Sequence, residues 1–455
     1  MKFYSQVGQD RFLLESFFRG KRGGVFLDIG AYDGETFSNT AFFERSMGWT
    51  GLCVEPLPTA FAKLTATRKS LCENLCVGDF EGEADFTEAN DPHGPNEQMF
   101  SGLAAHQSPR DVSRMDGLNM VRVPRRVQVT KLSTLLTKHS LFDIDFCSID
   151  TEGAELAVLS SFDPAKFRVG VFAIENNWDD ERIPKLMAEK GYEFFARLEQ
   201  DYIFRRRDVQ PLARTSVICA VWHGDPDRHA LLRGHAENLA RQSAAVDPIY
   251  VFDNNDAPPD WLHARAIRVK EPLTIYQAWN VALSLVATPF VMNLNLDDRL
   301  APDAVRLLEM ELVKNRAAAA GGDWKICYSQ EETDTVDPCY PASDLPFVPD
   351  WPPARNTRTR LGSGTGQRGT LGPATMWRME AHIGAPRYPW RLRDGTLIQV
   401  AADLAWWQIL QRNPNVKLLA LPVVIGNYHS HPGGQAEFRA GDERGMMADP
   451  GVSLT

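Results

Sequence analysis

The stretch that decides the fold is "GGVFLDIGAYDGETFSNT", which runs from Gly23 to Thr40. It begins as a short apolar run of strand-forming residues, continues through an acidic turn that contains glycine, and ends in polar residues that can cap a helix. An α/β sheet presents a nucleotide-like cofactor in this way, at the carboxyl end of a strand. The stretch therefore predicts a cofactor site, and the residues of the turn decide which cofactor fits.

The turn lacks the G-x-G-x-x-G pattern that accommodates a pyrophosphate in nicotinamide-binding domains. It reads "DIGAYDG" from Asp28 to Gly34, with a carboxylate on either side of Gly30. Such a turn suits a ligand that carries an ammonium group and no phosphate, and S-adenosylmethionine is such a ligand. We therefore expect Asp28, Gly30 and Asp33 to bind S-adenosylmethionine.

Four more residues complete the predicted cofactor site. Glu55 ends the run "TGLCVE" and can accept hydrogen bonds from both ribose hydroxyls, and Asp79 ends "VGD" and can meet the adenine amino group. Gln6 precedes the first strand and can close over the cofactor, and Ser38 follows the turn. Each also has an ordinary structural interpretation, since acidic residues commonly end strands and Ser38 can cap a helix. Their order at successive strand ends favours the cofactor interpretation.

The chain has 455 residues, which is too long for one ordinary hydrophobic core and fits two domains of about 200 residues each. Between residues 25 and 204, β-branched or aromatic runs alternate with amphipathic stretches, which is typical of βαβ units in a mainly parallel sheet. A basic, proline-containing stretch follows, and the alternation then restarts. The predicted fold is α/β with two domains, 1–210 and 211–455.

Charge and apolar patterning exclude several classes of protein. The formal net charge of -10 argues against nucleic-acid binding, which depends on Lys and Arg. The longest apolar run is interrupted by Thr288 and Pro289, and the N-terminus has no signal-peptide pattern. The seven cysteines are scattered without C-x-x-C spacing, which favours reduced thiols over a zinc site. We expect a cytoplasmic protein, free or peripheral to the inner face of the membrane, with no transmembrane segment.

Four motifs of the first half define a resemblance. They are "SQVGQDRFLL", "FLDIGAYDGETFSNT", "GWTGLCVEPLP" and "IDFCSIDTEGAELAVL", in this order within residues 1 to 205. Together they resemble the FkbM-type family of S-adenosylmethionine-dependent O-methyltransferases. The resemblance implies a Rossmann-like methyltransferase sheet and methyl transfer to a hydroxyl group, often on a sugar.

Three carboxylates are candidates for the base in such a reaction. Methyl transfer from a sulfonium is an in-line displacement, so the acceptor oxygen must be aligned and must lose its proton. Asp150 and Glu152 follow one predicted strand, and Glu175 of "AIENN" follows the next. A carboxylate at a strand end is about as often a helix cap as a base, so the choice among the three stays open.

A second acidic site is predicted in "VMNLNLDDRLAPD", where Asp297 and Asp298 follow a buried strand. Adjacent carboxylates at a strand end can bind a hard divalent ion that neutralises a leaving diphosphate. The same pair is also consistent with a simple turn before a helix.

The motifs of the second half define another resemblance. "SVICAVWHGD", "VFDNND", "NLNLDDRLAPD" and "VAADLAWWQIL" fall in the order of family 2-like glycosyltransferases of the GT-A fold, across residues 214 to 435. The resemblance implies a nucleotide-sugar site in which Asp253 contacts the base, Asn295 the ribose and Asp297 a divalent metal, Mn or Mg, with Asp298 close by. It also implies that Asp403 removes the proton of the acceptor hydroxyl.

Two departures and one further candidate accompany this resemblance. Asn295 stands where the first Asp of D-x-D is usual, and Ala402 replaces the Glu before Asp403. Asn brings no charge to a metal. The segment "NYHSHPGGQ" adds His429 and His431, and His431 is the further metal candidate; its alternative is an ordinary loop residue.

The sequence thus predicts a bifunctional enzyme of surface glycan biosynthesis. It would O-methylate a sugar hydroxyl and transfer a sugar from a nucleotide-sugar donor to a glycan or glycolipid acceptor, with inversion. The alternative is a methyltransferase whose second half is a degenerate, non-catalytic glycan-binding module, which Asn295 and Ala402 favour.

Overall fold

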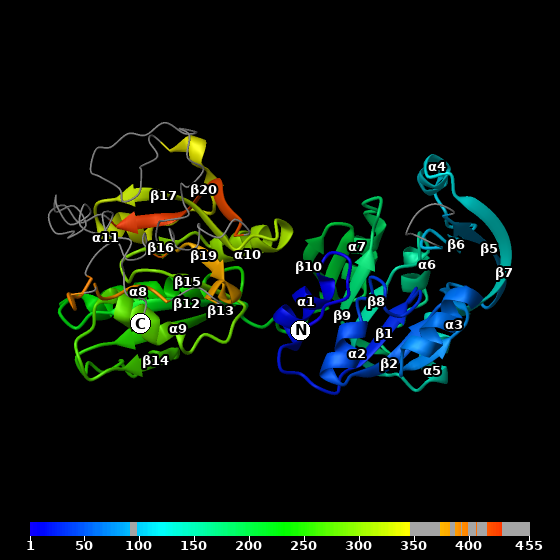
Figure 1. The fold of residues 1–455 in the computed structure, drawn as a ribbon. Helices are drawn as coiled ribbons and strands as arrows, with labels where there is room; N and C mark the ends of the chain where they lie inside the picture. The colour runs from blue at the N-terminus through cyan, green and yellow to red at the C-terminus, as the bar shows by residue number, and fades with distance from the viewer. Residues whose placement is uncertain are drawn as a thin grey trace. The chain divides into compact units, whose positions relative to one another are not determined.

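The chain divides into two compact units, Met1–Leu212 and Ala213–Thr455. Figure 1 shows the computed structural model as a ribbon. It describes residues 1–91, 98–345, 374–382, 387–392, 394–398, 406 and 416–429. Each unit combines a sheet with helices, which confirms the predicted α/β class with two domains. None of the helices within these ranges has the length and apolar character that crossing a membrane requires.

The main sheet of the N-terminal unit has seven strands in the order β10-β11-β9-β8-β1-β2-β3. These strands are β1 (Val25–Ile29), β2 (Thr50–Val54), β3 (Leu71–Glu73), β8 (Asp143–Ile149), β9 (Arg168–Glu175), β10 (Tyr192–Leu198) and β11 (Asp201–Arg206). The accompanying helices are α1 (Gln9–Leu13), the π-helix η1 (Leu14–Phe18), α2 (Ala41–Met47), α3 (Pro58–Thr67), α5 (Leu132–Lys138), α6 (Glu155–Ser160) and α7 (Arg182–Glu189).

The strand order reverses at the centre of this sheet. β1 pairs in parallel with β2 on one side and with β8 on the other, and β8 pairs in parallel with β9. The chain passes from β1 to β2 in one direction and from β8 to β9 in the other, as Figure 1 shows. In open α/β sheets, ligands bind outside the carboxyl ends of the strands at such a reversal. The reversal therefore places a ligand site after Ile29 and Ile149.

The core of the N-terminal unit explains the apolar runs of its strands. Leu27 and Phe172 of the sheet are fully buried and share one cluster with Leu135 of α5 and Val158 of α6. Parallel strands that helices cover on both faces read as nearly continuous apolar runs.

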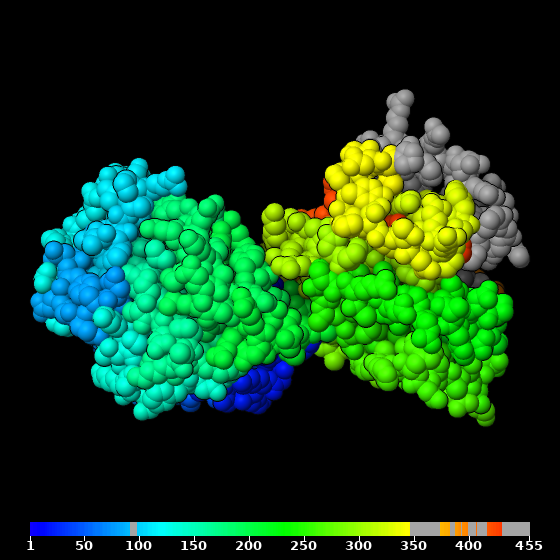
Figure 2. All heavy atoms as spheres, turned by 180° about the vertical axis from the view of Figure 1, so that it is seen from behind, coloured from blue at the N-terminus to red at the C-terminus, as the bar shows by residue number. Residues whose placement is uncertain are grey.

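A second sheet of four strands, in the order β4-β7-β5-β6, is inserted between β3 and β8. Its elements are β4 (Cys76–Gly78), β5 (Gly82–Asn90), β6 (Gly102–Leu103), β7 (Val121–Lys131) and the helix α4 (Pro109–Gly117). These residues form one edge of the N-terminal unit, in blue to cyan, both in the ribbon and in the space-filling view of Figure 2. Because β4 belongs to this sheet, Asp79 does not lie at an end of the main sheet.

The C-terminal unit contains one nine-stranded sheet in the order β14-β13-β12-β15-β19-β17-β20-β16, with β18 paired to β20. The strands are β12 (Thr215–Val221), β13 (Val246–Phe252), β14 (Arg265–Arg268), β15 (Phe290–Asn293), β16 (Arg299–Leu300), β17 (Ala319–Cys327), β18 (Tyr340–Pro341), β19 (Met376–Arg378) and β20 (Leu418–His429). The described helices are α8 (Arg228–Ala240), α9 (Ile275–Leu283), α10 (Ala304–Lys314), α11 (Gln330–Asp334) and the 3-10 turns η2 (Ala342–Asp344) and η3 (Met379–His382).

This sheet also has a reversal of strand order. β12 pairs in parallel with β13 on one side and with β15 on the other. The carboxyl ends of β12 and β15 therefore lie next to each other, where ligands bind in α/β sheets. The segment that follows β15 begins at Leu294 and contains the predicted D-x-D-like residues.

Candidate functional site

A cavity of about 360 Å³ lies at the reversal of strand order in the N-terminal unit. The turn after β1 and the segment after β8 both border it. The end of β2, the end of β9, the first residues of the chain and the inserted four-stranded sheet supply the remaining walls. The cavity thus lies where the strand order predicts a ligand.

Gly30 brings the turn after β1 against the segment after β8. Its φ of +85° is left-handed, and a Cβ added to it would lie 1.7 Å from the carbonyl oxygen of Asp150. The amide of Gly30 donates a hydrogen bond of 3.0 Å to the carbonyl oxygen of Val54. No side chain other than hydrogen fits this position without moving the backbone.

Asp28 is buried at the end of β1 and borders the cavity. Thr40 donates a hydrogen bond of 2.5 Å to its carboxylate, and the guanidinium of Arg68 lies 3.7 Å away. Burial raises the pKa of Asp28 above its usual value, while Arg68 and the hydroxyls counteract this effect. Arg68 is itself buried and also pairs with Glu44. No local sequence signal marks Arg68, because its partners lie far from it along the chain.

Glu55 is 5% exposed and is held by two backbone amides. One carboxylate oxygen accepts a hydrogen bond of 2.9 Å from Tyr32, and the other accepts one of 2.8 Å from Leu57. Burial raises the pKa of Glu55 to about 7. Each oxygen keeps capacity for one more hydrogen bond on the side of the cavity, so Glu55 remains available to a ligand.

Two carboxylates of the predicted cofactor set do not border the cavity. Asp33 accepts hydrogen bonds from the amides of Glu35 and Thr36, at 2.9 and 2.7 Å, and from the Thr36 hydroxyl at 2.7 Å. It therefore stabilises its own turn. Asp79 is exposed after β4, since its strand belongs to the inserted sheet. The structure places Leu75 and Val77, in place of Asp79, on the cavity wall.

Gln6 and Ser38 both border the cavity. Gln6 accepts a hydrogen bond of 3.3 Å from Gln200, and its neighbour Gln9 donates one of 2.7 Å to Asp201. These bonds fix the first residues of the chain against Gln200 and the first residue of β11, Asp201. Ser38 also accepts a hydrogen bond of 3.1 Å from the first amide of α2, so it contributes to the start of that helix as well.

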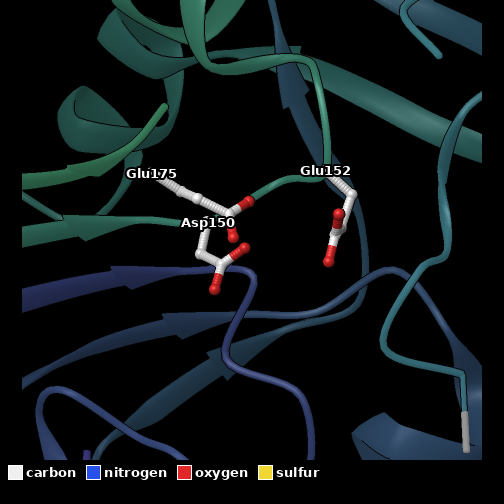
Figure 3. Close-up of side chains that lie close together, drawn as sticks. All are labelled: Asp150, Glu152 and Glu175. Carbon is white, nitrogen blue, oxygen red and sulfur yellow. The ribbon is translucent and has the colours of Figure 1, made fainter. Parts of the chain in front are cut away.

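Asp150, Glu152 and Glu175 form a cluster of carboxylates, which we call the carboxylate cluster. One oxygen of each lies within 4.8 Å of one oxygen of both others. In Figure 3, Asp150 and Glu175 lie side by side and Glu152 faces them from the following turn. Asp150 is exposed to the cavity, whereas Glu175 is 8% exposed. The structure thus brings together the three candidates that the sequence left open.

Burial and mutual repulsion shift the titration of the carboxylate cluster. Although Asp150 opens onto the cavity, the surrounding protein desolvates its carboxyl group and raises its pKa to about 7, and the nearby Asp201 raises it as well. Burial also raises the pKa values of Glu152 and Glu175 well above their usual range, and Asp150 adds to both shifts.

Glu155 shapes the turn that carries Glu152. Its carboxylate accepts hydrogen bonds of 2.9 Å from the amide and the hydroxyl of Thr151, and one of 3.1 Å from the amide of Gly153. This turn holds Glu152 at a left-handed φ of 52°. Glu155 has no role in the site predicted from the sequence, although an acidic residue in the first turn of a helix is a recognisable signal.

The inserted sheet supplies residues that sequence reasoning missed. The segment from Gln98 to Ser101 borders the cavity, and so does Arg114 of α4. The Arg114 guanidinium lies 4.3 Å from the centre of the Phe100 ring. No local motif marks these residues, because only the pairing of β5 with β7 brings them to the cavity.

In the C-terminal unit, Asp253 is 3% exposed and makes three hydrogen bonds. His223, after β12, donates from its amide at 2.8 Å, and its Nδ1 lies 2.9 Å from the carboxylate. The amide of Leu273 donates a third hydrogen bond of 3.1 Å. Asp253 thus fixes His223 beside the ends of β12 and β13, a contact that the sequence did not indicate.

Asp297 and Asp298 have different surroundings. Asp298 is fully buried, and one of its oxygens accepts a hydrogen bond of 3.0 Å from the amide of His429 in β20. Burial raises its pKa well above the usual value, and Asp297 raises it further. Asp297 is partly exposed, and its carboxylate lies 4.0 Å from Nδ1 of His429. Asn295 lies in the same segment and is partly buried.

The remaining predicted residues of the second site are not among the described residues. They are Asp403, with Ala402 before it, and His431.

The N-terminal unit is therefore a doubly wound α/β domain whose ligand cavity lies at the reversal of strand order and is lined by carboxylates. Residues 28–194 match the family model described as "Methyltransferase FkbM domain". This part of the chain is similar to the methyltransferase domains of that family. No curated protein matches the sequence.

Three solved structures illustrate the remaining similarities. The structure of S. aureus TarS 1-349 with UDP-GlcNAc has 12% identity and a TM-score of 0.34, covering 49% of this chain and 60% of that chain. The structure of S. aureus TarS has 13% identity and a TM-score of 0.31, covering 46% and 35%. The mannosyltransferase PcManGT from Pyrobaculum calidifontis, solved with GDP-Man and Mn2+, has 17% identity and a TM-score of 0.21, covering 25% and 36%. The matched region spans less than two thirds of each of these solved chains.

Proposed function

We propose that the N-terminal unit transfers the methyl group of S-adenosylmethionine to a hydroxyl group of a sugar. The charge of the cavity carries this proposal. Among the described residues that line it, only Arg114 is basic, and seven are carboxylates: Asp28, Glu55, Asp150, Glu152, Glu175, Glu199 and Asp201. S-adenosylmethionine carries a sulfonium and an ammonium group and no phosphate, so such a wall attracts it and disfavours a dinucleotide.

The contacts of the cavity suggest how the cofactor lies. Glu55 accepts hydrogen bonds from the ribose hydroxyls with the capacity that its two backbone amides leave free. Gly30 borders the cavity and lets the turn after β1 lie against Asp150, so the turn and the carboxylate cluster share one wall. Leu75 and Val77 offer an apolar wall to the adenine ring beyond Glu55.

The carboxylate cluster then receives the acceptor. The acceptor oxygen attacks the methyl carbon, the carbon–sulfur bond breaks as the carbon–oxygen bond forms, and S-adenosylhomocysteine leaves. The hydroxyl proton passes to a carboxylate of the cluster. Asp150 suits this role because it faces the cavity and has a pKa of about 7, so that much of it is ionised at neutral pH.

Calorimetric titration of the full chain with S-adenosylmethionine, S-adenosylhomocysteine and NAD tests the cofactor. We expect the first two to bind and NAD to fail. Transfer of a labelled methyl group to a panel of free and lipid-linked sugars tests the reaction, and Asp150→Asn should lower turnover while it preserves cofactor binding. Tight binding of NAD without binding of S-adenosylmethionine would refute the proposal.

For the C-terminal unit we propose transfer of a sugar from a nucleotide-sugar donor to a glycan or glycolipid acceptor, with inversion. Its support is the reversal of strand order between β12 and β15, with Asp253, Asn295 and Asp297 in the segments that follow β13 and β15. Asp297 would hold a divalent metal on the diphosphate. Two steps on one surface glycan would gain from the high effective concentration within one chain.

The buried position of Asp298 favours a second candidate function, a glycan-binding module without catalysis. Asp298 is bound to the amide of His429, and Asn295 has no charge, so Asp297 is the one carboxylate within residues 294–298 that has solvent access. Hydrolysis of a panel of nucleotide sugars with and without Mn²⁺ separates the two functions. Metal-dependent release of nucleotide diphosphate supports the transferase, and binding of glycans without such release supports the module.

A further inference from the structure

We propose that Asp150, Glu152 and Glu175 bind a divalent cation, Mg²⁺ or Mn²⁺, that holds the acceptor hydroxyl in the N-terminal cavity. The proposal rests on the proposed methyl transfer and deepens it, since it names a second ligand of the same cavity. It also defines the acceptor class, because a cation with open positions favours two adjacent oxygens such as the vicinal hydroxyls of a sugar.

The spacing of the carboxylate cluster fits a single cation. Oxygen ligands lie about 2.0 to 2.6 Å from Mg²⁺ or Ca²⁺, so two ligands of one ion are at most about 4 to 5 Å apart. The three carboxylates each have an oxygen within 4.8 Å of the others, so small side-chain movements bring all three to one ion. Three hard oxygen ligands from three successive points of the chain therefore already surround one position.

The surroundings of Glu175 indicate a missing ligand. Its side chain is 8% exposed and points toward Asp150 (Figure 3). Among the described residues, no N–H group donates a hydrogen bond to its carboxyl group, and its side-chain hydrogen-bond partner is the carboxyl group of Asp150. Two neighbouring carboxylates repel each other unless one of them carries a proton or a cation lies between them.

The other buried carboxylates of this cavity show how unusual the carboxylate cluster is. Asp28 accepts a hydrogen bond from Thr40, and Asp201 accepts one from Gln9. Glu55 is held by two backbone amides. Each of these carboxylates has its compensation from the protein, while the three members of the carboxylate cluster face one another.

The cluster also leaves room for a substrate. Asp150 is exposed to the cavity and Glu152 is partly exposed, so an ion between them would keep coordination positions open on that side. A hydroxyl group bound there becomes more acidic and lies next to the proposed cofactor site. Its proton would pass to the second oxygen of a cluster carboxylate, as in the proposed methyl transfer, and its oxygen would attack the methyl carbon as the carbon–sulfur bond breaks.

Titration of the full chain with Mn²⁺, followed by electron paramagnetic resonance of the free ion, tests the site. All variants carry Asp297→Asn, so that the proposed C-terminal metal position does not contribute. We expect Glu175→Gln and Asp150→Asn each to weaken Mn²⁺ binding by about tenfold or more, since each removes one charged ligand. Glu199→Gln is the matched control, because it removes the same charge from the same cavity outside the cluster, and it should retain binding.

Cofactor binding in the presence of EDTA separates this inference from the proposed function. A Glu175→Gln variant that still binds S-adenosylmethionine is folded. Weaker binding of Mn²⁺ to this variant would therefore support the proposed cation site. Equal Mn²⁺ affinity in the Asp297→Asn protein with and without Glu175→Gln would overturn the inference and leave the methyltransferase proposal intact. Mn²⁺ binding to the cluster in a protein that fails to bind S-adenosylmethionine would support the site and sink the proposed methyl transfer.

Discussion

Gly30 and Asp150 meet through their backbones at the point where β1 and β8 end. The amide of Asp150 donates a hydrogen bond of 3.0 Å to the carbonyl oxygen of Ile29, and the carbonyl oxygen of Asp150 occupies the space where a Cβ of residue 30 would lie. One junction therefore positions both the glycine turn and the first residue of the carboxylate cluster.

Gly30→Ala should destabilise the N-terminal unit by about 2 to 5 kcal/mol. The left-handed backbone costs about 1 to 2 kcal/mol, and the displaced junction costs about 1 to 3 kcal/mol. Hydrogen exchange of peptides from β1 and β8 in the full chain should show loss of protection. Gly20→Ala is the control, because Gly20 has a similar φ of +81° with nothing within 4 Å of the added Cβ. Equal effects of the two substitutions would contradict the close junction.

Glu55→Gln and Asp33→Asn should differ in their effects on cofactor affinity. The amide at position 55 would turn a donor toward one of the two backbone N–H groups or toward the ribose, which costs about 1 to 3 kcal/mol, or about 5- to 150-fold in affinity. Asn at position 33 keeps an acceptor for the turn amides, so binding should change little. Calorimetry with S-adenosylmethionine measures both. A large loss in Asp33→Asn alone would restore Asp33 as a direct ligand.

Stability of the ligand-free N-terminal unit should depend on the titration of Asp201. Burial raises the pKa of Asp201 to about 6, above the value of about 3.9 in an unfolded chain. The folded state therefore binds more protons between about pH 4 and about pH 6, and this carboxylate lowers stability as the pH rises through that window. Asp201→Asn removes the titration and keeps an acceptor for Gln9. In calorimetric scans, wild type should lose stability relative to the variant from pH 4 to pH 6. If the difference in stability between the two proteins stayed constant over this range, Asp201 would be ionised throughout it.

The main sheet could be predicted from the sequence, because the residues that mark each of its strands are adjacent along the chain. Each parallel strand is an apolar run with a carboxylate or glycine at its end, so the positions of Gly30, Glu55 and Asp150 could be expected at one edge of one sheet. The α/β class with two domains is confirmed for the same reason.

The inserted sheet and the partners of single carboxylates could not be predicted in this way. Asp79 follows a run that reads like the next strand of the main sheet, but pairing with β7, about 50 residues later, takes β4 into another sheet. Asp33 and Asp298 have the residue type of a ligand, yet their oxygens bond to nearby or distant amides. Only the folded backbone decides whether such a side chain faces a cavity or its own chain.

In the C-terminal unit, substitutions of three aspartates should have three different effects, on donor binding, on stability and on glycosyl transfer. Asp297→Ala should weaken metal-dependent binding of a nucleotide sugar, since it removes the exposed carboxylate beside His429. Asp298→Ala should instead lower thermal stability, because it leaves the buried amide of His429 without an acceptor, at a cost of about 1 to 3 kcal/mol. Asp403→Asn should keep donor binding and lose about 10² to 10⁴-fold in glycosyl transfer, as expected when an amide replaces a general base.

The three measurements are separable within one set of variants. Donor binding with and without Mn²⁺, calorimetric unfolding and transfer to a glycan acceptor each report on one of the three residues. If Asp298→Ala lost metal-dependent donor binding at unchanged stability, Asp298 would be a metal ligand that turns outward when the donor binds. If wild type bound no nucleotide sugar with any divalent metal, the glycan-binding module would be the better description of this unit, because the partly exposed Asp297 would then have no diphosphate to neutralise.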